Sequence, residues 1–281
     1  MKIPIVKLQG AGNDFIMLDN RALKLAPEQK VRFVRHFCRP RLSVGADGVA
    51  FLEDDPELDL AWDFYNSDGS PAEMCGNGSR CFAVFATSIG AAKSPFTFRT
   101  LAGPIRAEIT QPLDASDAAR ARVQLTPAGA FAKHELAAEG RAFTGYLLNT
   151  GVSHFVVPLP DPAEFDAFDV ARYGRALRFH ERFAPAGANV NFLKVDGAGE
   201  VWIRTYERGV EAETLACGTG SVASAIVAGE VLGAGGAEKV VHTRGGDLLR
   251  ISYAPAASGY DQVFLEGPAV RVFVGEVVFP G

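Results

Sequence analysis

The chain contains one unusual phrase twice. "EMCGNGSRC" covers residues 73–81 and "LACGTGSVAS" covers residues 215–224, and each sets a cysteine before Gly-x-Gly and a serine. Cys75 and Cys217 lie 142 positions apart (217 − 75), about half of the 281 residues. A repeat of this period indicates two copies of one structural unit and therefore constrains the whole fold.

The repeat extends beyond the cysteine phrase. Further blocks match in the same order at offsets of 140–143, and even the two tryptophans, Trp62 and Trp202, fall at matching points. The matching blocks are GVAFL (48–52) with NVNFL (189–193), TLAGPIRAEI (100–109) with TRGGDLLRIS (243–252), and RVQLTP (122–127) with QVFLEGP (262–268). Two helices of similar composition would not explain these ordered flanks. We therefore expect homologous domains at 1–135 and 136–270, with a last strand, 271–281, that packs onto the first domain.

Each half predicts the same α+β domain. The segments 79–92 and 221–234, which follow the two cysteines, are apolar nearly all round, so each should be a buried central helix. Residues 26–39 have the pattern of an amphipathic helix with a proline in its first turn. Short alternating segments bounded by Gly and Pro predict strands. The expected fold is two pseudo-symmetric domains, each a mostly antiparallel sheet or barrel wrapped round its helix, and the alanine-rich stretches 112–122 and 132–142 should be exposed connections.

Composition excludes several classes of function. The chain is 48% hydrophobic and 22% charged, with a net charge of −5 and no basic cluster, which argues against a nucleic-acid partner. No apolar run reaches the ~18 residues of a membrane span. The start reaches Asp14 without an apolar signal core, and four cysteines suit a reducing compartment, so we expect a cytoplasmic protein. The spacing of Cys75 and Cys81 does not suit zinc, and we expect no metal.

The repeated phrase has chemical consequences. A Gly-x-Gly before a helix lets a ligand approach the backbone, and the first N–H groups of the helix together with its dipole favour a carboxylate or phosphate. A cysteine at that place should have a lowered pKa. One such element could serve a nucleophile, a redox centre or plain packing. Cys38 and Cys81, on apolar faces, are interpreted as buried small hydrophobes.

Two such elements favour a narrower interpretation. If the two domains form one active site in the cleft between them, a carboxylate could sit at both helix starts with a thiol on each side. One thiolate could then remove a proton from the carbon next to that carboxylate while the other thiol protonates the opposite face. Backbone N–H donors would stabilise the charge that develops, without a cofactor.

These residues carry a resemblance to the diaminopimelate epimerase family over essentially the full length. The motifs that match in order are GAGNDF (10–15), GADG (45–48), NSDGSPAEMCGNGSRC (66–81), NVNF (189–192), YERGVEAETLACGTGS (206–221) and GPA (267–269). Proline racemases and hydroxyproline epimerases share the fold and the two cysteines, but typically carry His where this chain has Asn77. The resemblance therefore implies an isomerase that interconverts LL- and meso-2,6-diaminopimelate for lysine and peptidoglycan precursor synthesis. It also implies a homodimer.

The resemblance implies roles for individual residues. Cys75 and Cys217 would be the two acid/base residues, with neither pyridoxal phosphate nor metal. The N–H groups of Gly76, Asn77, Gly218 and Thr219 would hold the carboxylate of the reacting centre. Substrate ammonium and carboxylate groups would be bound by Asn13, Asn66, Asn189, Glu207 and Arg208, and His154 and Glu207 would modulate the pKa of the cysteines. A purely structural role also stays open: His154 as a buried histidine with satisfied hydrogen bonds, and Glu207 and Arg208 as exposed charges.

Two positions depart from the family pattern. The family often has Gly-Asn-Pro-His where this chain has GVSH (151–154), and Val152 cannot make the hydrogen bonds of that asparagine. Gly48 stands where some members carry a glutamine that touches substrate. Both cysteines and both glycine loops are intact, so the departures bear on the substrate and not on the reaction. A racemase of another amino acid, a thiol redox enzyme and a two-lobed binding protein for an anion remain the alternatives.

Overall fold

A buried helix lies at the centre of each half of the chain. Helix α2 spans Gly76–Ser88 and helix α5 spans Gly218–Glu230. Eleven residues of α2, from Gly76 to Ala86, and nine of α5, from Gly220 to Ala228, are buried. Both helices were expected from their apolar sequences, and both are confirmed. Burial on all sides is expected of a helix that is apolar nearly all round.

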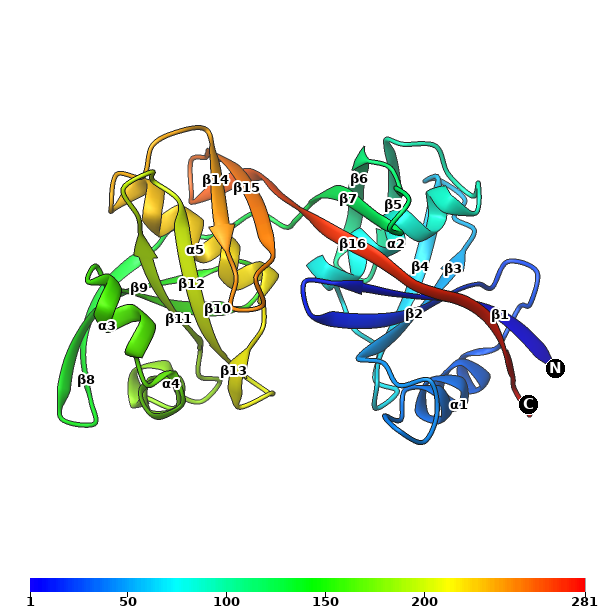
Figure 1. The fold of residues 1–281 in the computed structure, drawn as a ribbon, viewed down its shortest axis with the longest axis horizontal. Helices are drawn as coiled ribbons and strands as arrows, with labels where there is room; N and C mark the ends of the chain where they lie inside the picture. Colours follow the sequence, from blue (N-terminus) through cyan, green and yellow to red (C-terminus); the bar gives the residue numbers. More distant parts are fainter. Residues whose placement is uncertain (281) are drawn as a thin grey trace. The chain divides into compact units, whose positions relative to one another are not determined.

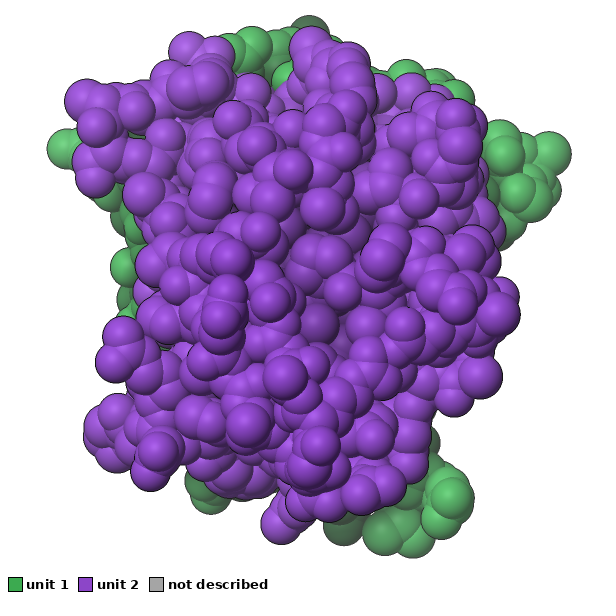
Figure 2. Space-filling model, turned by 90° about the vertical axis from the view of Figure 1, so that its left-hand side faces the viewer, with its two compact units in different colours: residues 1–124, 266–281 green, residues 125–265 purple. Residues whose placement is uncertain are grey.

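The structure, a computed structural model, describes residues 1–280 and contains two compact units (Figure 1). Unit 1 comprises Met1–Gln124 and Glu266–Gly281, and unit 2 comprises Leu125–Leu265. Figure 2 shows the two units in different colours. The α+β fold with a central helix in each unit confirms the expected fold class.

Unit 1 is a closed ring of strands around α2. Its strands are β1 (Lys2–Gly10), β2 (Asn13–Asp19), β3 (Gly48–Glu53), β4 (Leu60–Asn66), β5 (Phe96–Thr100), β6 (Gly103–Gln111), β7 (Ala118–Gln124) and the last part of β16 (Tyr260–Val278). They are hydrogen-bonded in that order, and β16 closes the ring by pairing with both β7 and β1. The pairs β2–β3 and β4–β5 are parallel and the others antiparallel. Closure removes exposed sheet edges and surrounds α2 with apolar faces.

Unit 2 has a similar order of strands around α5, with β8 at one end of its sheet. Its strands are β8 (Ala132–Ala138), β9 (Arg141–Asn149), β10 (Ser153–Pro158), β11 (Asn189–Val195), β12 (Val201–Glu207), β13 (Ala212–Thr214), β14 (Glu238–His242) and β15 (Leu248–Pro255). The order runs β8-β9-β10-β11-β12-β14-β15-β16, with the short β13 paired to β12. Strands β10–β11 and β12–β14 are parallel, as are their counterparts in unit 1. The topology therefore repeats with the sequence.

Shorter helices cover a second core in each unit. Helix α1 spans Pro27–Phe37, close to the expected 26–39, and packs Phe33 and Phe37 against Phe279. In unit 2, α3 (Pro162–Ala167), α4 (Val170–Arg178) and a 3₁₀ turn (Glu181–Phe183) cover a core that includes Phe155 and Phe192. None of the helices within residues 1–280 has the length and apolarity to cross a membrane.

Two expectations from the sequence are wrong. The alanine-rich stretches 112–122 and 132–142 contain strands, because β7 and β8 run through them, and Ala119 and Ala121 are buried. The alternation of small and charged residues there is a strand pattern.

The two tryptophans are also not equivalent. Trp62 pairs with Leu52 and is buried. Trp202 pairs with Lys194, which lies one residue after Leu193, the counterpart of Leu52, and Trp202 is 36% exposed. A shift of one residue moves a side chain to the other face of a sheet.

Candidate active site

Both repeated cysteines lie directly before a central helix. Cys75 caps α2 with φ −140° and ψ 115°, and Cys217 caps α5 with φ −132° and ψ 112°. This extended geometry turns the chain so that the next three residues begin the helix with N–H groups that have no partner within it. The repeated phrase therefore produces the same local structure twice, with a sulfur beside a helix start.

The two thiols have different immediate contacts. Cys75 Sγ accepts a hydrogen bond from the N–H of Gly78 at 3.4 Å. Cys217 is buried, and its Sγ lies 3.6 Å from the hydroxyl of Thr219. A helix start and a donor to sulfur both favour the thiolate over the thiol. Burial instead raises the pKa of the thiols of Cys38 and Cys81 to about 12, so these two cysteines stay neutral packing residues as expected.

In unit 1 the residues beside Cys75 form a chain of polar contacts. Asn77 donates from Nδ2 to Asn13 Oδ1 at 2.8 Å, and Asn13 in turn donates to Asp47 Oδ2 at 2.8 Å. Arg80 is completely buried and donates to Asn77 Oδ1 at 2.9 Å and to the carbonyl of Gly76 at 3.3 Å. The fold therefore brings the side chains of Asn13 and Asn77 into contact beside Gly76, and hydrogen bonds to Asp47 and Arg80 hold both amides in place.

In unit 2 the residues beside Cys217 form a second chain. His154 is completely buried, with Nε2 2.9 Å from Thr219 Oγ1 and Nδ1 2.9 Å from Asn191 Nδ2. Burial, and secondarily the positive charge of Arg208, lowers the pKa of His154 to about 3. The imidazole is therefore neutral at physiological pH. Both ring nitrogens make hydrogen-bond contacts, as a buried histidine requires. One of these contacts is to Thr219, whose hydroxyl also lies beside Cys217 Sγ.

Asn189 joins two loops that carry predicted substrate-binding residues. Its Nδ2 donates to the carbonyl of Ser153 at 3.3 Å, and its Oδ1 accepts from the backbone N–H of Arg208 at 2.8 Å. Glu207 and Arg208 follow directly at the end of β12, and both are half-buried. Asn189 thereby holds the segment that presents Arg208, whose guanidinium suits a carboxylate.

The remaining positions singled out by the sequence are placed as follows. Asn66 is exposed at the end of β4 and donates from Nδ2 to Ser70 Oγ at 3.1 Å. Val152 is half-buried in the loop before β10. A Cβ at Gly48 would lie 2.7 Å from the carbonyl of Tyr65 and 2.9 Å from the ring of Phe64. The packing of Phe64 therefore requires glycine at position 48, and no longer side chain fits there.

Four residues of these chains were not singled out from the sequence, namely Asp47, Arg80, Asn191 and Thr205. Arg80 is the charged residue in a helix otherwise treated as apolar, and Asn191 is a polar residue in a buried strand that also pairs with Thr205. A buried polar group must find partners, so a polar residue inside an apolar segment is the signal that could have found them.

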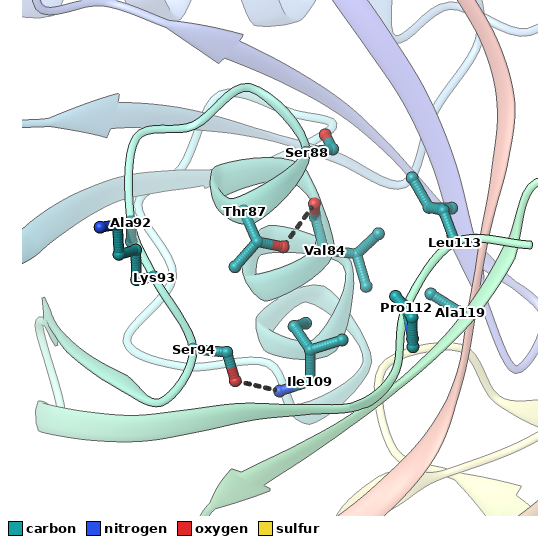
Figure 3. Close-up of a pocket in the computed structure, with 10 residues that line it drawn as sticks. All are labelled: Val84, Thr87, Ser88, Ala92, Lys93, Ser94, Ile109, Pro112, Leu113 and Ala119. Carbon is teal, nitrogen blue, oxygen red and sulfur yellow. Dashed lines mark hydrogen bonds between the residues drawn. The ribbon is translucent and has the colours of Figure 1, made fainter.

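A cavity of about 580 Å³ lies at the opposite end of α2 from Cys75 (Figure 3). Val84 and Ile109 contribute apolar side chains to its wall. The nearby hydroxyls of Thr87 and Ser94 are bonded to backbone groups, those of Val84 and Ile109, respectively. None of the predicted site residues lines it, so we assign it no part in the chemistry.

The chain shares its fold with other proteins of known structure. A crystal structure described as a probable proline racemase from Agrobacterium radiobacter K84 superposes with a TM-score of 0.69 at 17% identity, covering 99% of this chain and 93% of that one. At this identity the likeness shows the fold alone. The enzyme class, an amino-acid isomerase, follows from relatives of much higher sequence identity.

Sequence comparison narrows the class to one family. The family model described as diaminopimelate epimerase matches residues 5–125 and 146–272. A diaminopimelate epimerase from Hydrogenobaculum sp. is 47% identical, covering 96% of this chain and 97% of the relative. One from Aquifex aeolicus is 44% identical, covering 96% of each chain. The chain belongs to the diaminopimelate epimerase family, which confirms the resemblance inferred from its motifs.

Proposed function

We propose that the protein interconverts LL-2,6-diaminopimelate and meso-2,6-diaminopimelate without a cofactor. The observation that carries the proposal is the pair of cysteines that cap the two central helices, in a chain 47% identical along nearly its full length to a diaminopimelate epimerase. The reaction would serve the synthesis of lysine and peptidoglycan precursors.

Cys75 and Cys217 are the two acid/base residues in this proposal. One thiolate removes the α-proton, and the other thiol returns a proton to the opposite face of the same carbon. The helix-start N–H groups of Gly76, Asn77, Gly218 and Thr219 bind the α-carboxylate and stabilise the negative charge that spreads onto it. The neutral His154 and the carboxylate of Glu207 modulate the pKa values of the cysteines.

The rest of the substrate is held by polar side chains. Arg208 pairs with a carboxylate, and Glu207 with an ammonium group. Asn13, Asn66 and Asn189 contribute amide donors and acceptors. Two of these side chains are already held in place. Asn13 contacts Asp47 and Asn77, and Asn189 contacts two backbone groups. This supports a binding role, because a side chain that is already oriented loses little conformational freedom on binding.

The test is an exchange experiment with the purified, reduced protein. LL-diaminopimelate is incubated in D₂O without added cofactor, and α-deuteration and meso product are followed together by NMR and chiral chromatography. Deuterium at one stereocentre together with meso product is expected. Absence of both in freshly reduced protein would remove the substrate assignment.

A racemase of another amino acid is the second candidate, favoured by Val152. A valine in the GVSH loop cannot donate a hydrogen bond to the distal end of diaminopimelate. A screen of other amino acids in the same D₂O assay distinguishes the two candidates. Reduction of a disulfide substrate by the protein, without α-deuteration of amino acids, would instead point to a thiol redox enzyme.

A homodimer is the proposed assembly. Val272, Phe273, Val274 and Val278 on β16 are 43–70% exposed, an unusually apolar strand surface, which supports burial against a second copy. Sedimentation of the wild type and of Phe273→Glu tests it, with dissociation expected for the variant. A cytoplasmic location stays a prediction of the sequence.

A further inference from the structure

A continuous row of polar side chains lies beneath the start of α5. Thr205 on β12 donates from Oγ1 to Asn191 Oδ1 at 2.9 Å, and both residues are buried. Asn191 Nδ2 meets His154 Nδ1, and His154 Nε2 meets the hydroxyl of Thr219, each at 2.9 Å. The row ends at Cys217 Sγ, 3.6 Å from Thr219 Oγ1.

The donors of this row all point in one direction. Because the amide oxygen of Asn191 accepts from Thr205, its NH₂ group faces the ring, and His154 Nδ1 must be an acceptor. A neutral imidazole with an unprotonated Nδ1 carries its proton on Nε2. Thr219 Oγ1 accepts that proton in a hydrogen bond, so its own hydroxyl proton can be directed at Cys217 Sγ.

The repeat shows that the fold does not require such a row. Asn191 pairs with Thr205 across β11 and β12, and the equivalent pair across β3 and β4 is Ala50 with Phe64. Phe64 contacts Phe15 edge-on with ring centroids 5.8 Å apart. Unit 1 therefore has the apolar pair Ala50 and Phe64 where unit 2 has the hydrogen-bonded pair Asn191 and Thr205.

We propose that Asn191 is a positioning residue that fixes the tautomer of His154 and thereby makes the Thr219 hydroxyl a permanent donor to Cys217. The hydrogen bond stabilises the Cys217 thiolate and thereby prepares this cysteine to act as a base. The inference rests on the proposed acid/base role of Cys217. No proton is transferred along the row: when Cys217 takes up the substrate proton, the Thr219 bond only weakens.

The charged groups next to the row do not replace it. Arg208 and Glu207 adjoin it at the end of β12, and the positive charge of Arg208 acts on His154. Burial, and secondarily that charge, keeps the ring neutral. A neutral ring can pass on the direction of the hydrogen bonds, whereas an imidazolium would donate from both nitrogens.

The first experiment reads the tautomer directly. Protein labelled with ¹⁵N-histidine is examined by NMR, and the His154 signals are assigned by their loss in His154→Gln. The expected pattern is a proton on Nε2 and none on Nδ1, unchanged between pH 5 and pH 9, because burial lowers the pKa of His154 to about 3. A proton on Nδ1 would overturn the proposal.

The second experiment reads the thiolate without substrate. Alkylation of Cys217 by iodoacetamide is followed against pH in a Cys75→Ala protein, by mass spectrometry of the tryptic peptide. Thr219→Val, which keeps the backbone N–H, should slow the reaction at pH 7 about tenfold, the effect of one hydrogen bond to a charged group. Thr219→Ser keeps the hydroxyl and should react like the parent.

Asn191→Leu should slow alkylation of Cys217 to a similar degree and also change the His154 signals. Its fold is checked by alkylation of Cys75 in a Cys217→Ala background, which should not change. If Asn191→Leu does not fold, Thr219→Val still decides. An alkylation profile of Thr219→Val equal to that of the parent would disprove the proposal, even if the protein epimerises diaminopimelate. Loss of epimerisation alone, with the expected tautomer and alkylation profile, would count only against the proposed function.

Discussion

Gly220 of α5 and Asn191 of β11 lie so close that a methyl group would not fit between them. A Cβ placed on Gly220 would lie 2.3 Å from Asn191 Oδ1. Its counterpart in the repeat, Gly78, would place a Cβ no closer than 3.4 Å to any neighbour outside its own turn. Packing therefore requires the second glycine of the Cys-Gly-x-Gly phrase in unit 2, Gly220, but not its counterpart in unit 1, Gly78.

This difference predicts the effect of two matched substitutions. Gly220→Ala should lower the free energy of unfolding by about 1–3 kcal/mol, because the methyl group displaces the Asn191 amide from its bonds. Gly78→Ala should change it by less than about 1 kcal/mol, since only ordinary contacts form. Urea denaturation of both variants measures the effect, and equal losses would contradict it.

Each cysteine should be indispensable for turnover. Cys75→Ala and Cys217→Ala remove one of two proton-transfer groups, and kcat should fall by roughly 10²–10⁴-fold in each. Both variants should still bind diaminopimelate, as isothermal titration calorimetry would show, because the helix-start N–H groups are unchanged. Full activity in either variant would exclude the two-base mechanism, and Cys81→Ala is the matched control for a cysteine assigned to packing.

Oxidation should inactivate the protein reversibly if both thiols act on one carbon. Two thiols that reach opposite faces of the same atom can also form a disulfide on mild oxidation. Mass spectrometry should then show the loss of two protons and a peptide that links Cys75 with Cys217, and reduction should restore activity. Unchanged activity without a linked peptide would count against the shared carbon.

The buried guanidinium of Arg80 should stabilise unit 1. Arg80→Met leaves Asn77 Oδ1 without this donor, and an unsatisfied buried acceptor costs about 1–3 kcal/mol. We expect the free energy of unfolding to fall by about 1–3 kcal/mol in chemical denaturation. Lys93→Met, at an exposed position, is the control and should change stability by less than about 0.5 kcal/mol.

The neutral His154 should make stability depend on pH. Its pKa is lowered to about 3 in the folded protein and returns to about 6.5 on unfolding, so the unfolded chain binds the extra proton between these values. The contribution is fully present above pH 6.5 and is lost as pH falls toward 3, at up to ~1.4 kcal/mol per pH unit. His154→Gln should flatten the decline in unfolding free energy between pH 7 and pH 4.5, whereas His36→Gln, at an exposed position, should not.

Much of this architecture follows from the sequence by itself. The spacing of Cys75 and Cys217 and the ordered blocks around them predicted two equivalent domains, and the all-round apolar character of 79–92 and 221–234 predicted the buried helices that α2 and α5 confirm. These features are readable because they are local: a cysteine before Gly-x-Gly caps a helix in the same way wherever the phrase occurs. The motifs also identified the family, which the comparisons confirm.

The neighbours of each cysteine were decided only by the tertiary structure. Arg80 reaches Asn77 within its own helix, but Asn191, Thr205 and His154 come together from three strands that only pairing and register align. A shift of one residue in register, as separates Trp62 from Trp202, exchanges a buried side chain for an exposed one. Two phrases that look alike in sequence thus have different neighbours: Asn13 and Arg80 beside Asn77 in unit 1, and His154 and Asn191 beside Thr219 in unit 2. The reason is that most of these neighbours belong to strands distant in the chain.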